Sequence, residues 1–202
     1  MSDISNIIVS KMKRIAIFAS GNGTNAENLI RFFQDNEKIS VVKVLSNNPN
    51  AQVLERAKRL NVGTITFDKT ALSQTDEVLN ILKNSQPDLI VLAGFLWKFP
   101  EKILEAFPNK VINIHPALLP KYGGKGMYGK YVHQAIVDNK EIETGITIHY
   151  VNEHYDEGAI IFQAKCTVEP SDSFEDVAHK IHELEMEHFP KVVESLLTTK
   201  NE

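Results

Sequence analysis

Several features are scarce or missing in this chain of 202 residues. It has one cysteine, Cys166, so it cannot form an intrachain disulfide or a cysteine-based zinc site. No apolar run approaches the length of a membrane span, and the first residues lack the basic and apolar segments of a secretory leader. Basic residues are scattered, and the formal net charge of −4 disfavours nucleic acid and acidic membranes as partners. We therefore expect a cytoplasmic protein that acts on small molecules.

What is present is typical of one globular domain. Hydrophobic residues make up 43% of the chain and charged residues 24%, which is enough apolar material for a sizeable core. The length is close to the usual size of a domain, and the sequence shows no repeat, linker or low-complexity segment. Residues 1–202 are therefore predicted to form a single domain. Cys166 lies within a strand-like run and is interpreted as a packing residue.

The hydrophobic pattern alternates between strand-like and helix-like segments. It predicts strands at 14–19, 41–45, 64–67, 88–93 and 111–115, helices at 24–34, 53–60 and 73–84, two later strands at 145–151 and 159–168, and a final helix at 174–197. In the first helix we expect Thr24 or Asn25 to cap the N-terminus, and Leu29, Phe32 and Phe33 to be buried. The order predicts an α/β fold: a mostly parallel twisted sheet with a Rossmann-like N-terminal half, antiparallel late strands and a long C-terminal helix.

A glycine-rich turn joins the first strand to the first helix. Residues 20–26 read Ser-Gly-Asn-Gly-Thr-Asn-Ala, and Gly21 and Gly23 allow a ligand to approach the backbone closely. The helix N-terminus that follows offers free amides and a positive dipole end, which together favour a phosphate. A dinucleotide would need an acidic residue after the second strand, and residues 45–48 contain none. A monophosphate is therefore the better candidate than NAD, and a tight turn without a ligand is the alternative.

A second polar feature lies on the predicted strand at 111–115. Asn113 and His115 point to the same side of that strand, at the carboxyl end where α/β sheets bind ligands. Asp156, in the loop between the two late strands, would raise the pKa of His115 and orient its ring if it lay nearby. Asn113 would then donate to a developing oxyanion. A buried histidine and amide with purely structural partners are the alternative.

Three motifs in the same order resemble those of the folate-dependent formyltransferases. Residues 113–120 read Asn-Ile-His-Pro-Ala-Leu-Leu-Pro, which is similar to the hallmark of that family. Residues 145–151 and 155–158 resemble its second signature, which includes an aspartate at the position of Asp156. The glycine turn is similar to that of the members that formylate glycinamide ribonucleotide in purine synthesis. The resemblance covers about residues 12–197 and implies formyl transfer from 10-formyltetrahydrofolate to the amine of that ribonucleotide.

The resemblance also implies roles for individual residues. Asn113 and His115 would stabilise and protonate a tetrahedral intermediate, with Asp156 holding His115 protonated. Glu185 would meet the glycinamide end of the substrate. The remaining contacts form two groups: Gly23, Thr24 and Asn25 would hold the substrate phosphate, and Leu96, Trp97, Lys98, Phe99 and Asn113 would contact the folate. Formyl transfer of this kind needs an oxyanion stabiliser and a proton shuttle, so no metal is expected.

Two departures from the family pattern stand out. Residues 121–129 contain four glycines in a loop longer than is common, which suggests either a mobile flap with available lysines or a surface insertion. The usual arginine near the folate tail is missing between Phe67 and Ser73, and Lys69 is a candidate to replace it.

His149 shares a strand face with Thr147 and fits a polar pocket or the core equally well. His179, His182 and His188, on the charged final helix, are expected to be solvated or to act as caps.

Other functions share parts of this pattern. A methionyl-tRNA formyltransferase shares the Asn113/His115 pattern, but a further C-terminal domain and a basic surface would be expected. A formyltetrahydrofolate hydrolase would add an N-terminal regulatory domain. A non-catalytic sugar-phosphate sensor would use the glycine turn alone, and an ATP-dependent route lacks a G-x-x-x-x-G-K-[ST] motif. The expected partners are small molecules, and a monomer and a homodimer are both compatible with the sequence.

Overall fold

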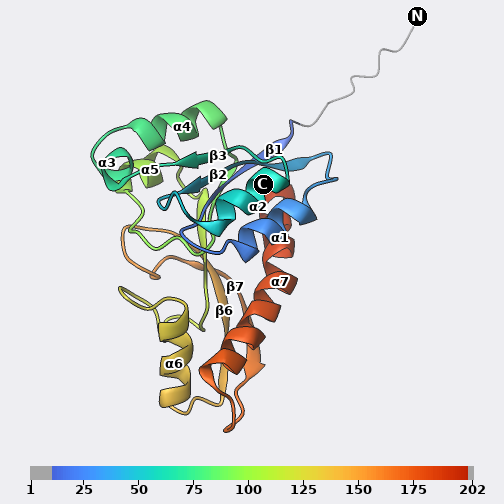
Figure 1. The fold of residues 1–202 in the computed structure, drawn as a ribbon, viewed down its shortest axis with the longest axis vertical. Coiled ribbons are helices and arrows are strands. Elements are labelled where there is room, and N and C mark those ends of the chain that lie inside the picture. Colours follow the sequence, from blue (N-terminus) through green and yellow to red (C-terminus); the bar gives the residue numbers. More distant parts are fainter. Residues whose placement is uncertain (1–10, 200–202) are drawn as a thin grey trace, which may run out of the picture.

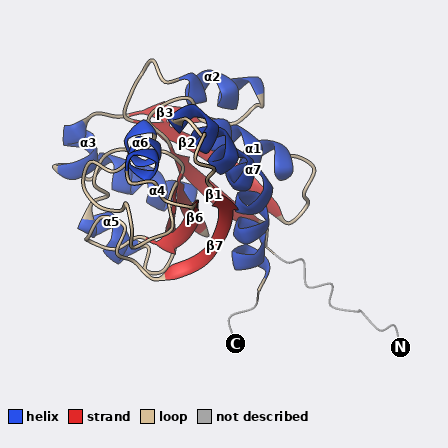
Figure 2. Cartoon of the chain, turned by 90° about the horizontal axis from the view of Figure 1, so that it is seen from below, coloured by secondary structure: helices blue, strands red, loops and turns tan. Residues whose placement is uncertain are grey.

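A computed structural model describes residues 11–199, which form a seven-stranded sheet with helices against both of its faces (Figure 1, Figure 2). The strand order is β3-β2-β1-β4-β5-β6-β7. The strands are β1 (Lys13–Phe18), β2 (Ile39–Ser46), β3 (Thr64–Thr66), β4 (Leu89–Leu92), β5 (Val111–His115), β6 (Glu143–Tyr150) and β7 (Ile160–Thr167). The helices are α1 (Thr24–Phe32), α2 (Gln52–Arg59), α3 (Lys69–Ser73), α4 (Glu77–Ser85), α5 (Glu101–Ala106), α6 (Lys130–Asp138) and α7 (Phe174–Thr198).

The sheet is parallel in its first part and antiparallel in its last part. Strands β3, β2, β1, β4 and β5 pair in parallel, whereas β6 runs antiparallel to both β5 and β7. The predicted fold class is therefore confirmed. The change of direction places β6 beside β5, with His149 opposite Asn113 and Thr147 opposite His115. Residues far apart in the sequence thereby meet at one end of β5.

Side chains of the central strands alternate between two hydrophobic clusters. On β1, Ile15 and Ile17 face the cluster built with α1, α2, α6 and α7, while Ala16 and Phe18 face the one built with α3, α4 and α5. All four are fully buried. The same alternation on β5 turns its two isoleucines toward the first cluster, so Asn113 and His115, which alternate with them, point to the opposite face.

The start and end of α1 differ from the prediction. Gly23 is the N-cap, with a left-handed φ of 79°, and neither Thr24 nor Asn25 caps the helix with a side chain. A Cβ at Gly23 would overlap Val53 of α2, so only glycine fits there. The helix ends at Phe32, two residues earlier than expected. Phe33 is buried as expected, but Phe32 is 43% exposed, so it lies outside the buried side of α1.

The helices between β3 and β6 depart most from the prediction. The single helix expected at 73–84 is two helices, since the side chain of Asp68 caps α3 by accepting the Ala71 N–H at 2.7 Å, and α4 starts only at Glu77. Helices α5 and α6 were not predicted, and α5 has only six residues, too short for a periodic signal. Helix α7 begins at the capping box of Ser173 and Asp176 and continues through the buried Pro190. None of the described helices is both long and apolar enough to cross a membrane.

Candidate active site

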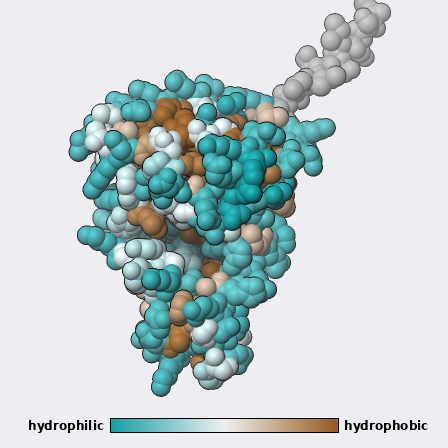
Figure 3. Space-filling view, in the orientation of Figure 1, coloured by the Kyte–Doolittle hydropathy of each residue, from teal (hydrophilic) through white to brown (hydrophobic). Residues whose placement is uncertain are grey.

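A cavity of about 660 Å³ opens at the carboxyl ends of β1, β4 and β5. The space-filling view shows hydrophobic atoms recessed in the middle of this side of the molecule, between hydrophilic surfaces (Figure 3). Apart from Lys69, every residue predicted to bind or react lines this cavity, and these residues come from several separate segments of the chain. They are Gly23, Thr24, Asn25, Leu96, Trp97, Lys98, Phe99, Asn113, His115, Asp156 and Glu185.

The glycine turn forms one end of the cavity with its main chain. Because no side chain of the described residues caps α1, the amides of its first turn are free to meet a ligand. Gly21 also lines the cavity, and a Cβ there would meet no described protein atom within 4 Å, so its space opens toward the ligand. A positive dipole end, free amides and open space are the features that bind a phosphate.

Glu185 lies beside this turn, on the cavity face of α7. Its Oε2 accepts a hydrogen bond from Asn25 Nδ2 at 2.8 Å. The side chain of Asn25 therefore orients Glu185, and the backbone amide of Asn25 remains for a phosphate. His182, one turn earlier on α7, has Nδ1 3.8 Å from the same Oε2, and this carboxylate raises the pKa of His182. A solvated or capping role was expected for His182, whereas it lines the cavity; its i, i+3 spacing from Glu185 was the available signal.

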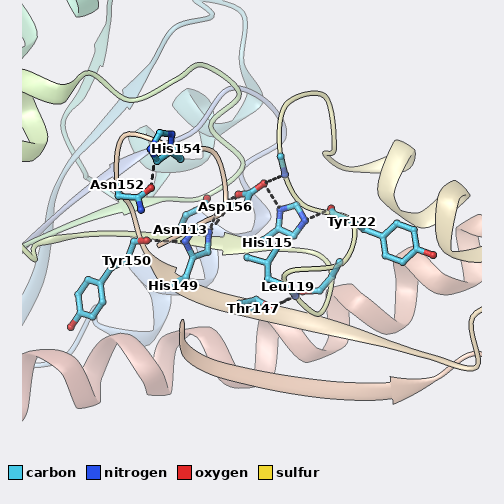
Figure 4. A network of polar contacts seen from close by, with 12 residues as sticks. Asn113, His115, Leu119, Tyr122, Thr147, His149, Tyr150, Asn152, His154 and Asp156 are labelled. Carbon is cyan, nitrogen blue, oxygen red and sulfur yellow. Dashed lines mark hydrogen bonds and ion pairs between the residues drawn. The ribbon is translucent and has the colours of Figure 1, made fainter. Parts of the chain in front are cut away.

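The other end of the cavity is built from side chains on β5, β6 and the following loop. Asp156 lies among three side chains: its Oδ2 is 3.5 Å from His115 Nδ1, and its Oδ1 is 3.5 Å from both Asn113 Nδ2 and His149 Nε2 (Figure 4). Gly124 N–H donates to Oδ2 at 2.9 Å. Asp156 thus lies beside His115, which is the condition for its expected effect on that ring. His149 belongs to the polar pocket rather than to the apolar core.

The neighbouring carbonyls fix the tautomers of both histidines. A carbonyl oxygen only accepts, so His149 Nδ1–H donates to Tyr150 O at 2.9 Å, and His115 Nε2–H donates to Tyr122 O at 2.8 Å. With its proton on Nδ1, His149 accepts from Asn113 Nδ2 at Nε2, at 3.1 Å. Among the described residues, the second N–H of Asn113 has only the long contact to Asp156. It is therefore the donor that a substrate oxygen would use.

The pKa of His115 reflects two opposing effects. Burial of the ring, whose side chain is 4% exposed, lowers the pKa of His115 and outweighs Asp156 and the Tyr122 carbonyl, which both raise it. Asp156 therefore acts on the pKa in the expected direction, while the net pKa lies below the ordinary 6.5 because of burial. Burial likewise raises the pKa of Asp156, but the nearby His149 and His115 rings and the Gly124 amide together lower it overall. Asp156 is thus a carboxylate placed to accept a hydrogen bond from His115 when that ring carries a proton on Nδ1.

Aromatic and apolar residues after β4 form the wall of the cavity. Trp97 packs edge-on against Phe67 at 6.3 Å and against Phe95 at 6.4 Å. Phe99 is buried and packs against Phe18 at 5.1 Å, while Leu96 is 48% exposed. A flat heteroaromatic ligand suits such a wall. Lys98 lines the cavity, but Lys69 does not, so the substitution of Lys69 for the folate-tail arginine finds no support in the cavity lining.

His133 and Cys166 differ in their position relative to the cavity. His133 of α6 lines it; the ring is buried, its Nδ1 has no hydrogen-bond partner among the described residues, and burial lowers its pKa. Cys166 is half-buried on β7 and does not line the cavity, and burial raises its pKa, as expected for a packing thiol. Within residues 11–199, no group of three or more His, Cys, Asp and Glu side chains is arranged to hold a metal ion.

The loop of residues 121–129 lies over the cavity rather than away from it. Gly124, Lys125 and Tyr128 line the cavity, and the Gly124 amide is the one bonded to Asp156. Of the two interpretations offered by the sequence, a loop over the site is the one that its placement favours. Its mobility stays a prediction.

Comparison with known proteins identifies the family. The model of the formyl transferase family matches residues 13–193. This chain belongs to the formyl transferase family. The family uses a folate-derived formyl donor and acts on small-molecule substrates.

Relatives within the family carry one recurring name. Phosphoribosylglycinamide formyltransferase of Bacillus subtilis is 34% identical over 197 residues, covering 94% of this chain and 97% of that protein. The chloroplastic phosphoribosylglycinamide formyltransferase of Arabidopsis thaliana is 33% identical over 189 residues, covering 91% of this chain and 65% of that protein. The crystal structure of glycinamide ribonucleotide transformylase 1 from Geobacillus kaustophilus superimposes with a TM-score of 0.84 at 34% identity, covering 92% of this chain and 99% of the other.

Proposed function

We propose that this chain transfers a formyl group from 10-formyltetrahydrofolate to the amine of glycinamide ribonucleotide, a step of de novo purine (IMP) biosynthesis. The observation that carries the proposal is one cavity that joins the glycine turn, the Glu185 carboxylate and the Asn113, His115 and Asp156 cluster. The names of the family members similar to this chain support the choice of acceptor.

The phosphate of the ribonucleotide binds at the glycine turn. The amides of Gly23, Thr24 and Asn25 face it there, and the N-terminus of α1 adds its positive dipole end. This contact holds the substrate by a part that does not react. The binding energy therefore orients the glycinamide arm toward the other end of the cavity.

Glu185 meets the amine of the glycinamide arm. Its Oε2 is held by Asn25, which leaves Oε1 to accept from the incoming ammonium or amine. The amine must be free of its extra proton before it attacks, and this carboxylate and two cavity histidines, His133 and His182, are available to take part in that exchange. Which of these three groups takes the extra proton of the amine depends on the position of the bound substrate.

Asn113 and His115 act on the formyl oxygen and on the leaving nitrogen. The spare N–H of Asn113 donates to the oxygen as negative charge develops on it. His115, once protonated on Nδ1, supplies the proton that the tetrahedral intermediate needs when the folate nitrogen leaves. Asp156 stabilises the charged ring, so it lowers the cost of protonating a buried imidazole.

The folate part of the donor binds against the segment after β4. Leu96, Trp97, Lys98 and Phe99 line that side, and Asn113 borders it. The donor supplies an activated formyl group, so the protein contributes binding, orientation and proton transfer and needs no nucleophile of its own. Lys98 is the cation of this wall and is proposed to meet the acidic tail.

The test is a spectrophotometric assay with purified protein, the stable donor analogue 10-formyl-dideazafolate and glycinamide ribonucleotide. Deformylation of the donor that depends on glycinamide ribonucleotide is the expected result. Donor loss in water alone, or transfer to charged methionyl-tRNA instead, would keep the formyl-folate chemistry and overturn the acceptor. For variants of Asp156 in this assay, the matched control is Glu157→Gln, which changes an exposed carboxylate next to Asp156 that does not line the cavity.

A further inference from the structure

A three-residue stretch of the loop after β5 contacts both members of the His115–Asp156 pair through its main chain. Tyr122 O accepts from His115 Nε2 at 2.8 Å, and Gly124 N–H donates to Asp156 Oδ2 at 2.9 Å. Gly123, between them, packs so tightly that a Cβ would press on Leu119 and approach the Asp156 side chain. The orientation of His115 therefore depends on where this stretch is held.

The backbone of Tyr122 needs an external anchor. Its φ of 57° is in the left-handed region, which a bulky side chain rarely adopts and which persists only where surrounding contacts enforce it. The tyrosine hydroxyl donates to Glu141 Oε1 at 2.9 Å. Glu141 lies in the turn between α6 and β6, outside the cavity lining, and also accepts from Lys121 Nζ at 3.0 and 3.1 Å.

We infer that Glu141 is a positioning residue for the reaction: through the hydroxyl of Tyr122 it holds the Tyr122 carbonyl against His115 Nε2 and so aims Nδ1 at Asp156 and the reacting atoms. Neither the Glu141 carboxylate nor the Tyr122 hydroxyl touches substrate. The inference rests on the proposed function only in giving His115 its proton-transfer role. The hydrogen bonds themselves are independent of which acceptor is formylated.

The protonation states of the anchor fit this direction. Burial and the nearby Glu141 raise the pKa of Tyr122, so its hydroxyl stays protonated and donates. The hydrogen bonds of Lys121 and Tyr122 lower the pKa of Glu141, so it is a carboxylate and accepts. At the other end of the chain of contacts, the Tyr122 carbonyl raises the pKa of His115. The other titratable groups that act on the His115 ring are Asp156, His149 and Glu185, and none of these described residues contacts Glu141 by a hydrogen bond or ion pair.

The test compares Tyr122→Phe and Glu141→Ala with wild type in steady-state kinetics and in NMR titration of His115. Because a ring held in the wrong orientation loses more in the reaction than in binding, we expect kcat to fall about tenfold in both variants, with KM for both substrates within about twofold. The midpoint of His115 protonation should move to lower pH in both, since a contact that raises its pKa is weakened. The double variant should be no slower than either single variant, because both break one contact.

Two controls separate positioning from general stability. Glu141→Gln keeps an oxygen that accepts from the Tyr122 hydroxyl, so it should restore most of kcat. Glu143→Ala removes a nearby carboxylate that also pairs with a lysine, Lys165 at 3.1 Å on the neighbouring strand, and should leave kcat and the His115 titration unchanged.

Three outcomes decide the inference. A lower melting temperature with unchanged kcat and an unchanged His115 midpoint in Tyr122→Phe and Glu141→Ala would reduce the anchor to a structural contact and overturn it. If Tyr122→Phe does not fold, the contrast between Glu141→Ala and Glu141→Gln decides in its place. If the wild type does not formylate glycinamide ribonucleotide, the proposed acceptor fails, yet the shift of the His115 midpoint still supports or contradicts the positioning role.

Discussion

The two ends of the cavity are built from different parts of the polypeptide. The end proposed to bind the phosphate (the phosphate end), at residues 21–25, is formed by main-chain amides, a glycine conformation and the start of α1. The end proposed to carry the reaction (the reaction end) is formed by the side chains of Asn113, His115 and Asp156, which come from β5 and from a loop much later in the chain. This contrast indicates which substitutions each end tolerates. Side-chain chemistry should matter most at the reaction end, and backbone shape at the phosphate end.

Asp156→Asn should have the largest effect of any single substitution in the cavity. The amide cannot hold a protonated His115 as the carboxylate does, so formyl transfer should fall by about two orders of magnitude or more, while KM for glycinamide ribonucleotide changes little. Steady-state kinetics beside Glu157→Gln, the neighbouring exposed carboxylate, measures this. A full rate in Asp156→Asn would remove the proton-transfer role and leave the fold assignment untouched.

Gly23→Ala should produce the opposite kinetic pattern. The added Cβ would overlap Val53 and force a left-handed φ of 79° on a residue that resists it, so the turn must shift. We expect KM for glycinamide ribonucleotide to rise about tenfold and the free energy of unfolding to fall by about 1–3 kcal/mol, with kcat at saturation largely kept. Gly63→Ala, which has ordinary contacts and no positive φ, is the matched control. A fall in kcat with unchanged KM would contradict a binding role for the turn.

The titration of His115 tests the electrostatics of the reaction end. Its pKa should lie below 6.5 in the folded protein and move still lower in Asp156→Asn, because Asp156 is a cause that raises it. Since the folded pKa is depressed, the unfolded chain binds more protons between the two pKa values, and the His115 contribution to the free energy of unfolding is lost as pH falls through that window. NMR of the ring protons across pH reports the midpoint. A midpoint above 6.5 would show that Asp156 outweighs burial.

Thr24→Ala should have the smallest effect. The proposed contact of Thr24 with the phosphate uses its backbone amide, and its side chain does not cap α1. Both kcat and KM should therefore stay within about twofold of wild type. The free energy of unfolding should also fall by less than is usual when a helix cap is removed. A tenfold rise in KM would mean that the hydroxyl binds the phosphate directly, and the contrast between the two ends would weaken.

The sequence predicted the parts of the molecule in which pattern and position coincide. Strand β5 was predicted with its observed bounds, and its alternation placed Asn113 and His115 on one face. The glycine turn was placed between β1 and α1 because Gly and Asn punctuate the hydrophobic pattern there. The short helices α3 and α5 escaped, since five or six residues carry no clear helical period.

What the sequence missed depends on contacts between distant segments. The Tyr122 carbonyl, the cavity position of His182 and the anchor at Glu141 follow from how loops and α7 fold back on the sheet, which residue types alone do not specify. The net pKa of His115 was not predictable from the sequence for a related reason. The expected carboxylate is present, but the degree of burial of the ring, which decides the direction, is a property of the packed structure.

The most direct test of the contrast between the two ends is calorimetric titration of glycinamide ribonucleotide into wild type, Asp156→Asn and Gly23→Ala. Binding energy is measured there without turnover, so the two roles separate. We predict a dissociation constant within about threefold of wild type for Asp156→Asn and at least about tenfold weaker binding for Gly23→Ala. Equal weakening in both variants, or weakening in Asp156→Asn alone, would contradict a phosphate end that binds and a reaction end that transfers.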